Sequence, residues 1–405
     1  MRFQTVSAAL LLVCLGVPDS FAQQDSPANP LTLQAALAAA DEHNRTLIAA
    51  RLGRTADLAG IDVAKQRPNP EASFEAGRDT PHEAFSIGIP LEFGGKRARR
   101  VDLANATLAR TTADLIVQAL DIRRSVRVAY FELVAAATRL QVITALRGFA
   151  ERTRNAARDR FESGAAPRLE ALQAELALAQ ADNEQEAARG RMDAARADLN
   201  TLIGRPPDAA ADPTDPFEGG TLPADLARAV AASPDIIAMD REIDEAVARE
   251  RLAQTLRTPD TTVSGGVLFD SPPEFMYGWK AGVAVTLPIF TRHTADVRVE
   301  SARVVQLRAQ REARIVELTG QATAAAARAR AARQRFLRYR DEIIPQARTV
   351  ESMAEDSYRS GQTGLAAFLQ ALQAAREIGL LATDAGLEYQ SAIADLERAL
   401  GGSIR

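Results

Sequence analysis

The residues best suited to chemistry are three histidines and one cysteine, and their spacing forms no site. His43, His82 and His293 are scattered, no H-x-x-x-H pair occurs, and Cys14 is the only cysteine. Soft metal ions need clustered His and Cys ligands. GxSxG, P-loop and HExxH motifs are also absent from the sequence. The pattern predicts a protein that is not an enzyme, with no cofactor and no metal site.

The charge and composition narrow the class further. Net charge is −4, from 49 Lys and Arg against 53 Asp and Glu. Without a strong basic field, nothing indicates nucleic acid as a partner. Aromatic residues make up only 5% of the chain and alanine is abundant. This composition favours closely packed long helices over a bulky globular core.

The first 22 residues have the pattern of a secretory signal peptide. A basic residue precedes an apolar run from Val6 to Val17, and the small residues Ser20 and Ala22 form a cleavage site. The run is too short to span a bilayer. Cleavage after Ala22 would remove Cys14. A lipoprotein would instead need Cys14 as its first mature residue, but the apolar run continues past it.

One turn-like pattern occurs twice, 197 residues apart. RFESGAAPRLEALQ (160–173) and SYRSGQTGLAAFLQ (357–370) each have an aromatic residue, then Ser-Gly, then Leu-Gln. The same offset separates Gly204 from Gly401. We therefore predict an internal repeat, with copies at 23–204 and 222–405. Taken alone, Ser-Gly is common turn chemistry, so each stretch could be a plain connector between helices.

Long helices must position these turns. Apolar residues recur every seven positions at Val101, Leu108, Leu115 and Ile122, which is a coiled-coil-like signal. A helix over 96–161 would be about 100 Å long, more than a compact domain needs. Residues 205–221 hold four prolines and two glycines and are predicted to be a linker. The other predicted helices are 168–203, 292–358 and 365–400.

Each copy has one region with the pattern of a β-hairpin, at 71–91 and at 261–289. In the second hairpin, the last strand alternates from Trp279 to Ile289 and is long enough for a tilted transmembrane strand. Four strands cannot close a barrel, and an open sheet edge cannot lie in lipid. Several chains must therefore pool their hairpins. A trimer would give twelve strands, and a dimer with eight remains open.

A different class of protein fits much of this pattern. An exported coiled-coil scaffold with two short hairpins and no pore would also alternate apolar and small residues in its strands. Cell fractionation separates the two hypotheses, because a barrel requires the outer membrane and a scaffold is soluble.

The chain resembles TolC-type outer-membrane efflux proteins, the exit ducts of Gram-negative tripartite pumps. The resemblance covers the chain after the signal peptide and is carried by several segments. They are LTLQAALAAADEHNRTL (31–47), RPNPEASFE (67–75), PLEFGGKRARR (90–100) and the two Ser-Gly stretches. With its short hairpins, LEFGGKRA is most similar to the outer-membrane subunits of heavy-metal efflux systems of the cobalt-zinc-cadmium type.

The resemblance implies a mainly α fold with a small β part. Three chains would form a twelve-stranded outer-membrane barrel, continued by an α-helical coiled-coil tunnel into the periplasm. Pro90 and Pro288 would mark the junction of barrel and tunnel. Extracellular loops would lie at 78–83 and 270–277. The implied partners are two further copies, a periplasmic membrane-fusion adaptor, an inner-membrane RND-type pump and outer-membrane lipid.

The resemblance also assigns the two Ser-Gly stretches to the periplasmic tips, where the adaptor docks. Gly164 and Gly361 suit a turn with unusual backbone angles. The implied docking residues are Ser163, Gly164, Ala165, Leu169, Ser360, Gly361, Gln362, Thr363 and Leu365.

Glu170, Phe161 and Tyr358 are the implied constriction or gate of the tunnel. Drug-exporting relatives carry an acidic ring just after the second tip, but the matching residues here are Ala367 and Gln370. An acidic constriction would therefore depend on Glu170. The alternatives are a solvated acid near a helix N-terminus for Glu170 and simple packing for the two aromatic residues.

The function implied is passive conduction of substrates, heavy-metal cations first among them, from the periplasm to the exterior. A duct for drugs or a type I secretion duct would have the same fold. The residues themselves do not name the substrate.

Overall fold

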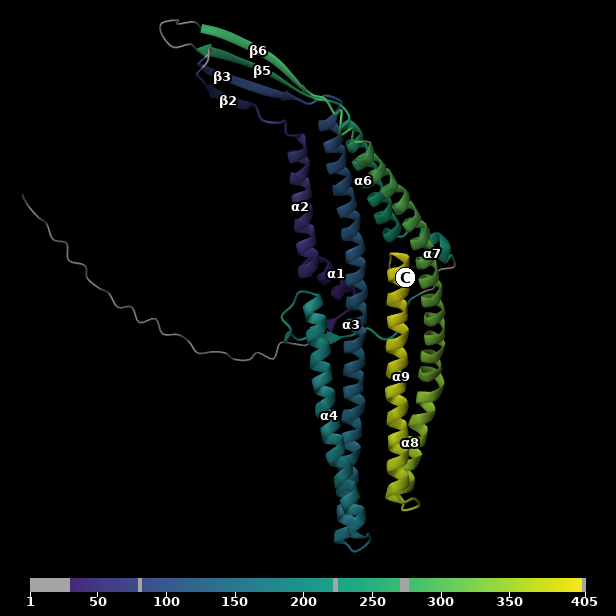
Figure 1. The fold of residues 1–405 in the computed structure, drawn as a ribbon. Helices are drawn as coiled ribbons and strands as arrows, with labels where there is room; N and C mark the ends of the chain where they lie inside the picture. The colour runs from purple at the N-terminus through teal and green to yellow at the C-terminus, as the bar shows by residue number, and fades with distance from the viewer. Residues whose placement is uncertain (1–29, 79–81, 221–224, 270–276, 403–405) are drawn as a thin grey trace, which may run out of the picture.

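The computed structural model describes residues 30–78, 82–220, 225–269 and 277–402, which form a long curved wall of helices with a small sheet at one end (Figure 1). The predicted signal peptide, residues 1–22, lies outside the described residues. So do residues 79–81, which are half of the first predicted extracellular loop, and residues 270–276, which are nearly all of the second.

At each level of the wall, four of the described helices stand side by side (Figure 1). Near the sheet the order is α2, α3, α6, α7, and far from it the order is α4, α3, α9, α8. Only α3 and the α7–α8 pair therefore run the full length. Their bounds are α2 Arg45–Lys65, α3 Lys96–Glu162, α4 Arg168–Leu202, α6 Pro234–Thr255, α7 Thr294–Arg338, α8 Ile344–Arg359 and α9 Leu365–Leu400. Two short helices, α1 (Leu33–His43) and α5 (Leu226–Ala231), pack beside the wall.

The sheet joins the two hairpins in the order β2-β3-β5-β6, with every pair antiparallel. The strands are β2 Glu71–Ala76, β3 Glu83–Leu91, β5 Asp260–Phe269 and β6 Tyr277–Thr286. The last strand was predicted to continue to Ile289, and this is wrong. It ends at Thr286 because Pro288 has no N–H to donate and the N–H of Ile289 bonds back to Leu287.

Two pairs of helices meet end to end and so complete the wall: α2 meets α4, and α6 meets α9. The Asn44 carboxamide oxygen accepts from the N–H groups of Thr46 and Leu47, which caps the start of α2. Its amide nitrogen donates to the Leu202 carbonyl at the end of α4. At the other junction, Gly401 has φ +76°, and a Cβ there would lie 2.1 Å from Pro234 at the start of α6. Glycine is therefore required where α9 meets α6.

A buried carboxylate fastens this second junction. Asp235, in the first turn of α6, accepts hydrogen bonds from Arg398 of α9 at 2.5 Å and from Arg314 of α7 at 3.0 Å. Burial alone would raise the pKa of Asp235, but the two guanidinium groups outweigh burial and hold that pKa below its ordinary value. One side chain therefore ties three helices together.

We expect Asp235→Asn to lower the free energy of unfolding by about 3 kcal/mol, because it leaves two guanidinium groups with a neutral partner. The stabilisation exists above the unfolded pKa of about 3.9 and is lost as pH falls through the lower folded pKa. Urea unfolding between pH 7 and 3 measures both effects. The control is Asp244→Asn, which removes an exposed pair with Arg241. Equal stability of the two variants would contradict this assignment.

The segment predicted to be a linker is a packed strap across the wall. Its residues Asp212–Pro213 (β4) pair in parallel with β1 (Pro30–Leu31). The buried Tyr130 hydroxyl donates to the Leu31 carbonyl and accepts from the N–H of Asp215. The four prolines thus mark a fixed path along the wall, and sequence composition did not reveal that packing.

The second long helix, predicted to be continuous over 292–358, is interrupted. A π-helical turn, η1 (Tyr339–Ile343), lies between α7 and α8. Pro345 has no N–H to donate to the carbonyl of Asp341, four residues before it. The N–H of Ile344 bonds instead to the Tyr339 carbonyl, five residues back.

By length and composition alone, α3 and α9 are apolar enough to cross a membrane. Both helices supply residues to the core of the wall, including Leu133 of α3 and Leu396 of α9.

Candidate functional site: the two tips, the seams and the sheet face

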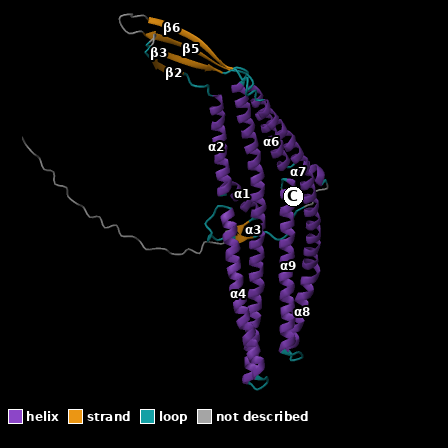
Figure 2. Ribbon diagram, viewed as in Figure 1, coloured by secondary structure: helices purple, strands orange, loops and turns teal. Residues whose placement is uncertain are grey.

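The two Ser-Gly stretches form matching turns at the end of the wall far from the sheet (Figure 2). Gly164 and Gly361 both have φ +75°. The N–H of Gly164 bonds to the Phe161 carbonyl, as that of Gly361 does to Tyr358. Positive φ favours glycine, so the repeated residue is explained by the same backbone turn.

Eight of the nine predicted docking residues are exposed at these turns, and Leu365 is not. Leu365 packs in a small core with Ala157, Ala174, Tyr358 and Phe368. Leu365 is the first residue of α9, and its side chain faces the other hairpin. It therefore holds the two hairpins together and is not available for docking.

Glu170 and Tyr358 meet across the two hairpins, although 188 residues separate them in the chain. The Tyr358 hydroxyl donates to Glu170 Oε1 at 3.2 Å, and Arg160 Nη1 donates to the same oxygen at 2.9 Å. The Arg160 guanidinium carbon also lies 5.8 Å from the centre of the Tyr358 ring. We call Arg160, Glu170 and Tyr358 the tip cluster.

Two of the three residues of the tip cluster are largely shielded from water, whereas the Arg160 side chain is 42% exposed. The Glu170 side chain is 15% exposed and Tyr358 is 7% exposed. Phe368 stacks on the Tyr358 ring at a centroid distance of 5.2 Å. Burial raises the pKa of the Tyr358 hydroxyl and the Glu170 charge raises it further, while Arg160 opposes the rise. The hydroxyl therefore stays protonated and able to donate at neutral pH.

Phe161, the third predicted gate residue, lies outside the tip cluster and is 41% exposed. Arg160 was missed in the sequence, although it and Glu170 form an opposite-charge pair across a predicted turn. Phe368 was also missed. Its ring is on the buried side of α9, and an apolar position in a helix does not by itself reveal what it contacts.

The sheet carries one continuous apolar face. The cross-strand rows include Phe85, Val267 and Trp279 side by side, and Ile89, Val263 and Val283 side by side. All six side chains are exposed, Trp279 by 82%. Most residues of the opposite face are small or polar, such as Ser86 and Gly282, and Leu268 is an exception. An exposed apolar face of this kind suits contact with lipid.

The predicted junction prolines lie near the base of the sheet. Pro90 pairs with Thr262 one residue before the end of β3, whereas Pro288 lies two residues beyond β6. Between the sheet and α7, Phe290 is almost fully exposed.

The two outer edges of the wall also expose uncharged stripes. On α7, the side opposite the core carries small residues at heptad-like spacing, and Val316 among them is 73% exposed. We call these residues the α7 stripe: Ala302, Ala309, Ala313, Val316, Gly320, Ala324, Ala327 and Ala331. On the opposite edge, the α2 stripe consists of Leu52, Ala56, Ala59 and Val63, all exposed. Neither stripe has a partner among the described residues of the chain.

No group of three or more His, Cys, Asp or Glu residues in the described segments is arranged to hold a metal ion.

The sequence matches the outer membrane efflux protein family over residues 36–205 and 226–402. It is 30% identical over 276 residues to the cobalt-zinc-cadmium resistance protein CzcC of Cupriavidus metallidurans. That alignment covers 67% of this chain and 66% of the relative, just under two thirds.

The fold is similar to solved channel structures. The Campylobacter jejuni CmeC outer membrane channel has a TM-score of 0.77 at 15% identity, covering 92% of this chain and 86% of that one. CusC has a TM-score of 0.75 at 17% identity, with 92% of each chain covered. At these identities the likeness establishes the fold alone.

Proposed function

The chain belongs to the outer membrane efflux protein family, and from that premise we propose that three copies form the exit duct of a tripartite efflux pump. The sheet would contribute to a barrel in the outer membrane, and the helical wall to a tunnel reaching into the periplasm. We also infer that the two halves are copies of one hairpin-and-helix unit. The duct itself supplies no energy, so an inner-membrane RND-type pump would drive export.

One observation carries this proposal: the sheet and the part of the wall next to it each have two incomplete edges. β2 and β6 end the sheet, and each pairs on only one side among the described strands. Directly below them, the α2 stripe and the α7 stripe lie exposed on opposite edges. A second copy of the chain fits this arrangement, because β6 can pair with the neighbour's β2 while the stripes pack below.

The number of copies follows from the size of the barrel. Two copies would give eight strands, and the interior of an eight-stranded barrel is filled by its own side chains. Twelve strands are the next multiple of four. Three copies are therefore the smallest ring with room for a passage, and cyclic rings are the usual form of such assemblies.

The experiment that tests this function is fractionation followed by semi-native electrophoresis. If the protein is an exit duct, we expect a trimer that is extracted from the outer membrane only by detergent. A soluble periplasmic monomer would refute the duct and favour the coiled-coil scaffold.

We propose that the adaptor docks on the exposed residues of the two turns, now without Leu365. The tip cluster would hold the tunnel closed until docking, because it ties the α3–α4 hairpin to α8. The two tips are not equivalent, since Glu170 has Ala367 as its counterpart in the second half. The gate would therefore act through the first tip's acid and the second tip's tyrosine.

Replacing both turn glycines with valine should abolish adaptor docking while trimers persist. Valine in a left-handed conformation costs at least about 1–2 kcal/mol per turn, so each turn would rearrange. No atoms lie within 4 Å of a Cβ built at Gly164 or Gly361, so the effect is confined to the backbone of the turns. Asparagine tolerates this conformation, and the double asparagine variant should keep export. Normal export by the double valine variant would contradict the docking assignment.

For the substrate, we propose heavy-metal cations, on the ground that the curated relative is a cobalt-zinc-cadmium resistance protein. Deleting the gene should then sensitise cells to salts of these metals. Sensitivity to drugs alone would assign the same duct to drug efflux.

A further inference from the structure

One residue of the strap, Phe217, places its aromatic ring in a groove of the wall. Phe217 lies over Gly386 of α9, where a Cβ would come within 2.7 Å of the phenyl ring. The same ring packs near Phe131 and Phe336, at centroid distances of 5.8 and 6.3 Å. Glycine at position 386 thus makes room for an aromatic ring between α3 and α7.

The groove continues past Phe217 and is empty there. Two helical turns away on the same face of α9, Gly379 again leaves the helix without a side chain. Here α3, α8 and α9 enclose about 400 Å³, within the range of small-molecule sites. The walls are mostly apolar, and Phe217 itself closes one end. The apolar side chains of these walls include Val142, Phe149, Phe336, Ile344 and Leu372.

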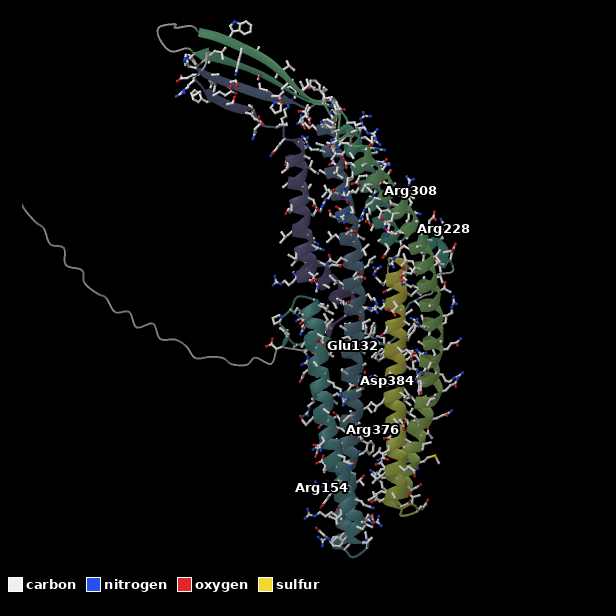
Figure 3. All side chains as sticks on the ribbon, viewed as in Figure 1. Glu132, Arg154, Arg228, Arg308, Arg376 and Asp384 are labelled. Carbon is white, nitrogen blue, oxygen red and sulfur yellow. The ribbon has the colours of Figure 1, made fainter. Side chains whose placement is uncertain are left out.

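The rim of the groove is positively charged. Arg340, Arg348 and Arg376 line it, with Glu351 as the only acid among the lining residues. Arg340 is paired with Glu218 of the strap at 2.7 Å, and Arg376 with Glu184 of α4 at 2.7 Å. Figure 3 labels Arg376 on α9, on the side toward the α3–α4 pair.

Arg348 is the rim cation best placed for a ligand. Among the described residues it makes no ion pair, and its charge lowers the pKa of the nearby Glu351 carboxyl. Burial raises the pKa of the Glu351 carboxyl and the charge of Glu355 raises it further, while Arg348 opposes the rise.

The groove does not involve the residues proposed to join the copies. Its lining comes from α3, the end of α7, η1, α8, α9 and the strap, all within one chain, and includes no residue of the α7 stripe or the α2 stripe. It also lies apart from the tip cluster, none of whose residues line it.

We propose that this groove is a binding site for a small aromatic carboxylate. The ring would occupy the space over Gly379 as Phe217 does over Gly386, and the carboxylate would face Arg348 at the rim. A bound ring would pack between α3 and α8 beside the π-helical turn, so it would brace the first turns of α8 against α3. The site does not depend on the proposed export function.

The probe is 4-(trifluoromethyl)benzoate, titrated into the full-length protein in lipid nanodiscs and followed by 19F NMR. We expect saturable binding to the wild type. Gly379→Leu should abolish it, because a Cβ there meets only Val142 at 3.7 Å, so the side chain fits and fills the groove. Gly148→Leu, which adds the same side chain on α3 outside the groove lining, should bind as the wild type does.

A comparison of the benzoate with its uncharged amide tests whether the ligand's negative charge is required. The corresponding benzamide should bind about tenfold more weakly than the benzoate, and Arg348→Met should remove that difference. Absence of saturable binding, or binding that survives Gly379→Leu, would overturn the proposal. Equal affinity for benzoate and benzamide would overturn the assignment of the carboxylate to Arg348.

Discussion

Combining Glu170→Gln with Tyr358→Phe should open the tip of the duct. The pair removes the hydroxyl donor of Tyr358 and the negative charge that attracts Arg160. Hydrogen bonds to charged groups contribute about 1.5–3 kcal/mol each. A loss of about 2 kcal/mol per chain shifts a closed–open equilibrium by about 30-fold. In planar bilayers, the purified variant should show a higher mean conductance than the wild type.

The control for this result is Glu162→Gln. Glu162 is also at the first tip, but its exposed partner is Arg158 in the same helix, so it does not tie the hairpins together. It removes the same charge and should leave conductance unchanged. If the double variant conducts as the wild type does, the tip cluster does not hold the duct closed.

The second large effect is expected from Val316→Asp, which should eliminate the trimer. Val316 is in the middle of the α7 stripe and would face the neighbouring copy. A carboxylate buried there has no partner, and such a charge costs about 3 kcal/mol or more at each seam, the contact between two neighbouring copies. All seams of a ring carry the change. Semi-native electrophoresis should therefore show monomers only.

Gln310→Asp is the matched control, because it adds the same charge on an exposed part of α7 outside the stripe. It should form trimers as the wild type does. Trimers of Val316→Asp would mean that the α7 stripe does not form the seam.

The sequence predicted the elements well where a local pattern determines them. The heptads of α3 and the alternation of Phe85, Ile87 and Ile89 were sufficient for the long helix and the strand. Failures came where a distant contact decides the outcome. Leu365 has the pattern of a tip residue, but its burial depends on Ala157 of the other hairpin.

The same limit applies to the strap and to the tip cluster. Tyr130 holds the strap through contacts 84 and 85 residues away in the chain, which no local composition reveals. Glu170 and Tyr358 were each selected through family resemblance, but their mutual hydrogen bond required the three-dimensional arrangement. The helix over 292–358 was predicted to be continuous although Pro345 lacks an N–H, which is a local property that disturbs a helix.

The central claim, a closed ring of three copies, is tested most directly by cysteine cross-linking in cells. Asp57 bonds to Thr111 and Glu245 to the adjacent Arg110, and Ala246 contacts Val304 and Leu307. These contacts place the α2 stripe near Ala59 at the level of the α7 stripe near Ala302.

The only native cysteine, Cys14, falls in the predicted signal peptide, so the background for cross-linking is low. A chain with both Ala59→Cys and Ala302→Cys, treated with a short bis-maleimide, should give covalent dimers and trimers. Each single variant should stay monomeric on a denaturing gel. Only monomers from the double variant, with both cysteines shown to be reactive, would contradict the ring.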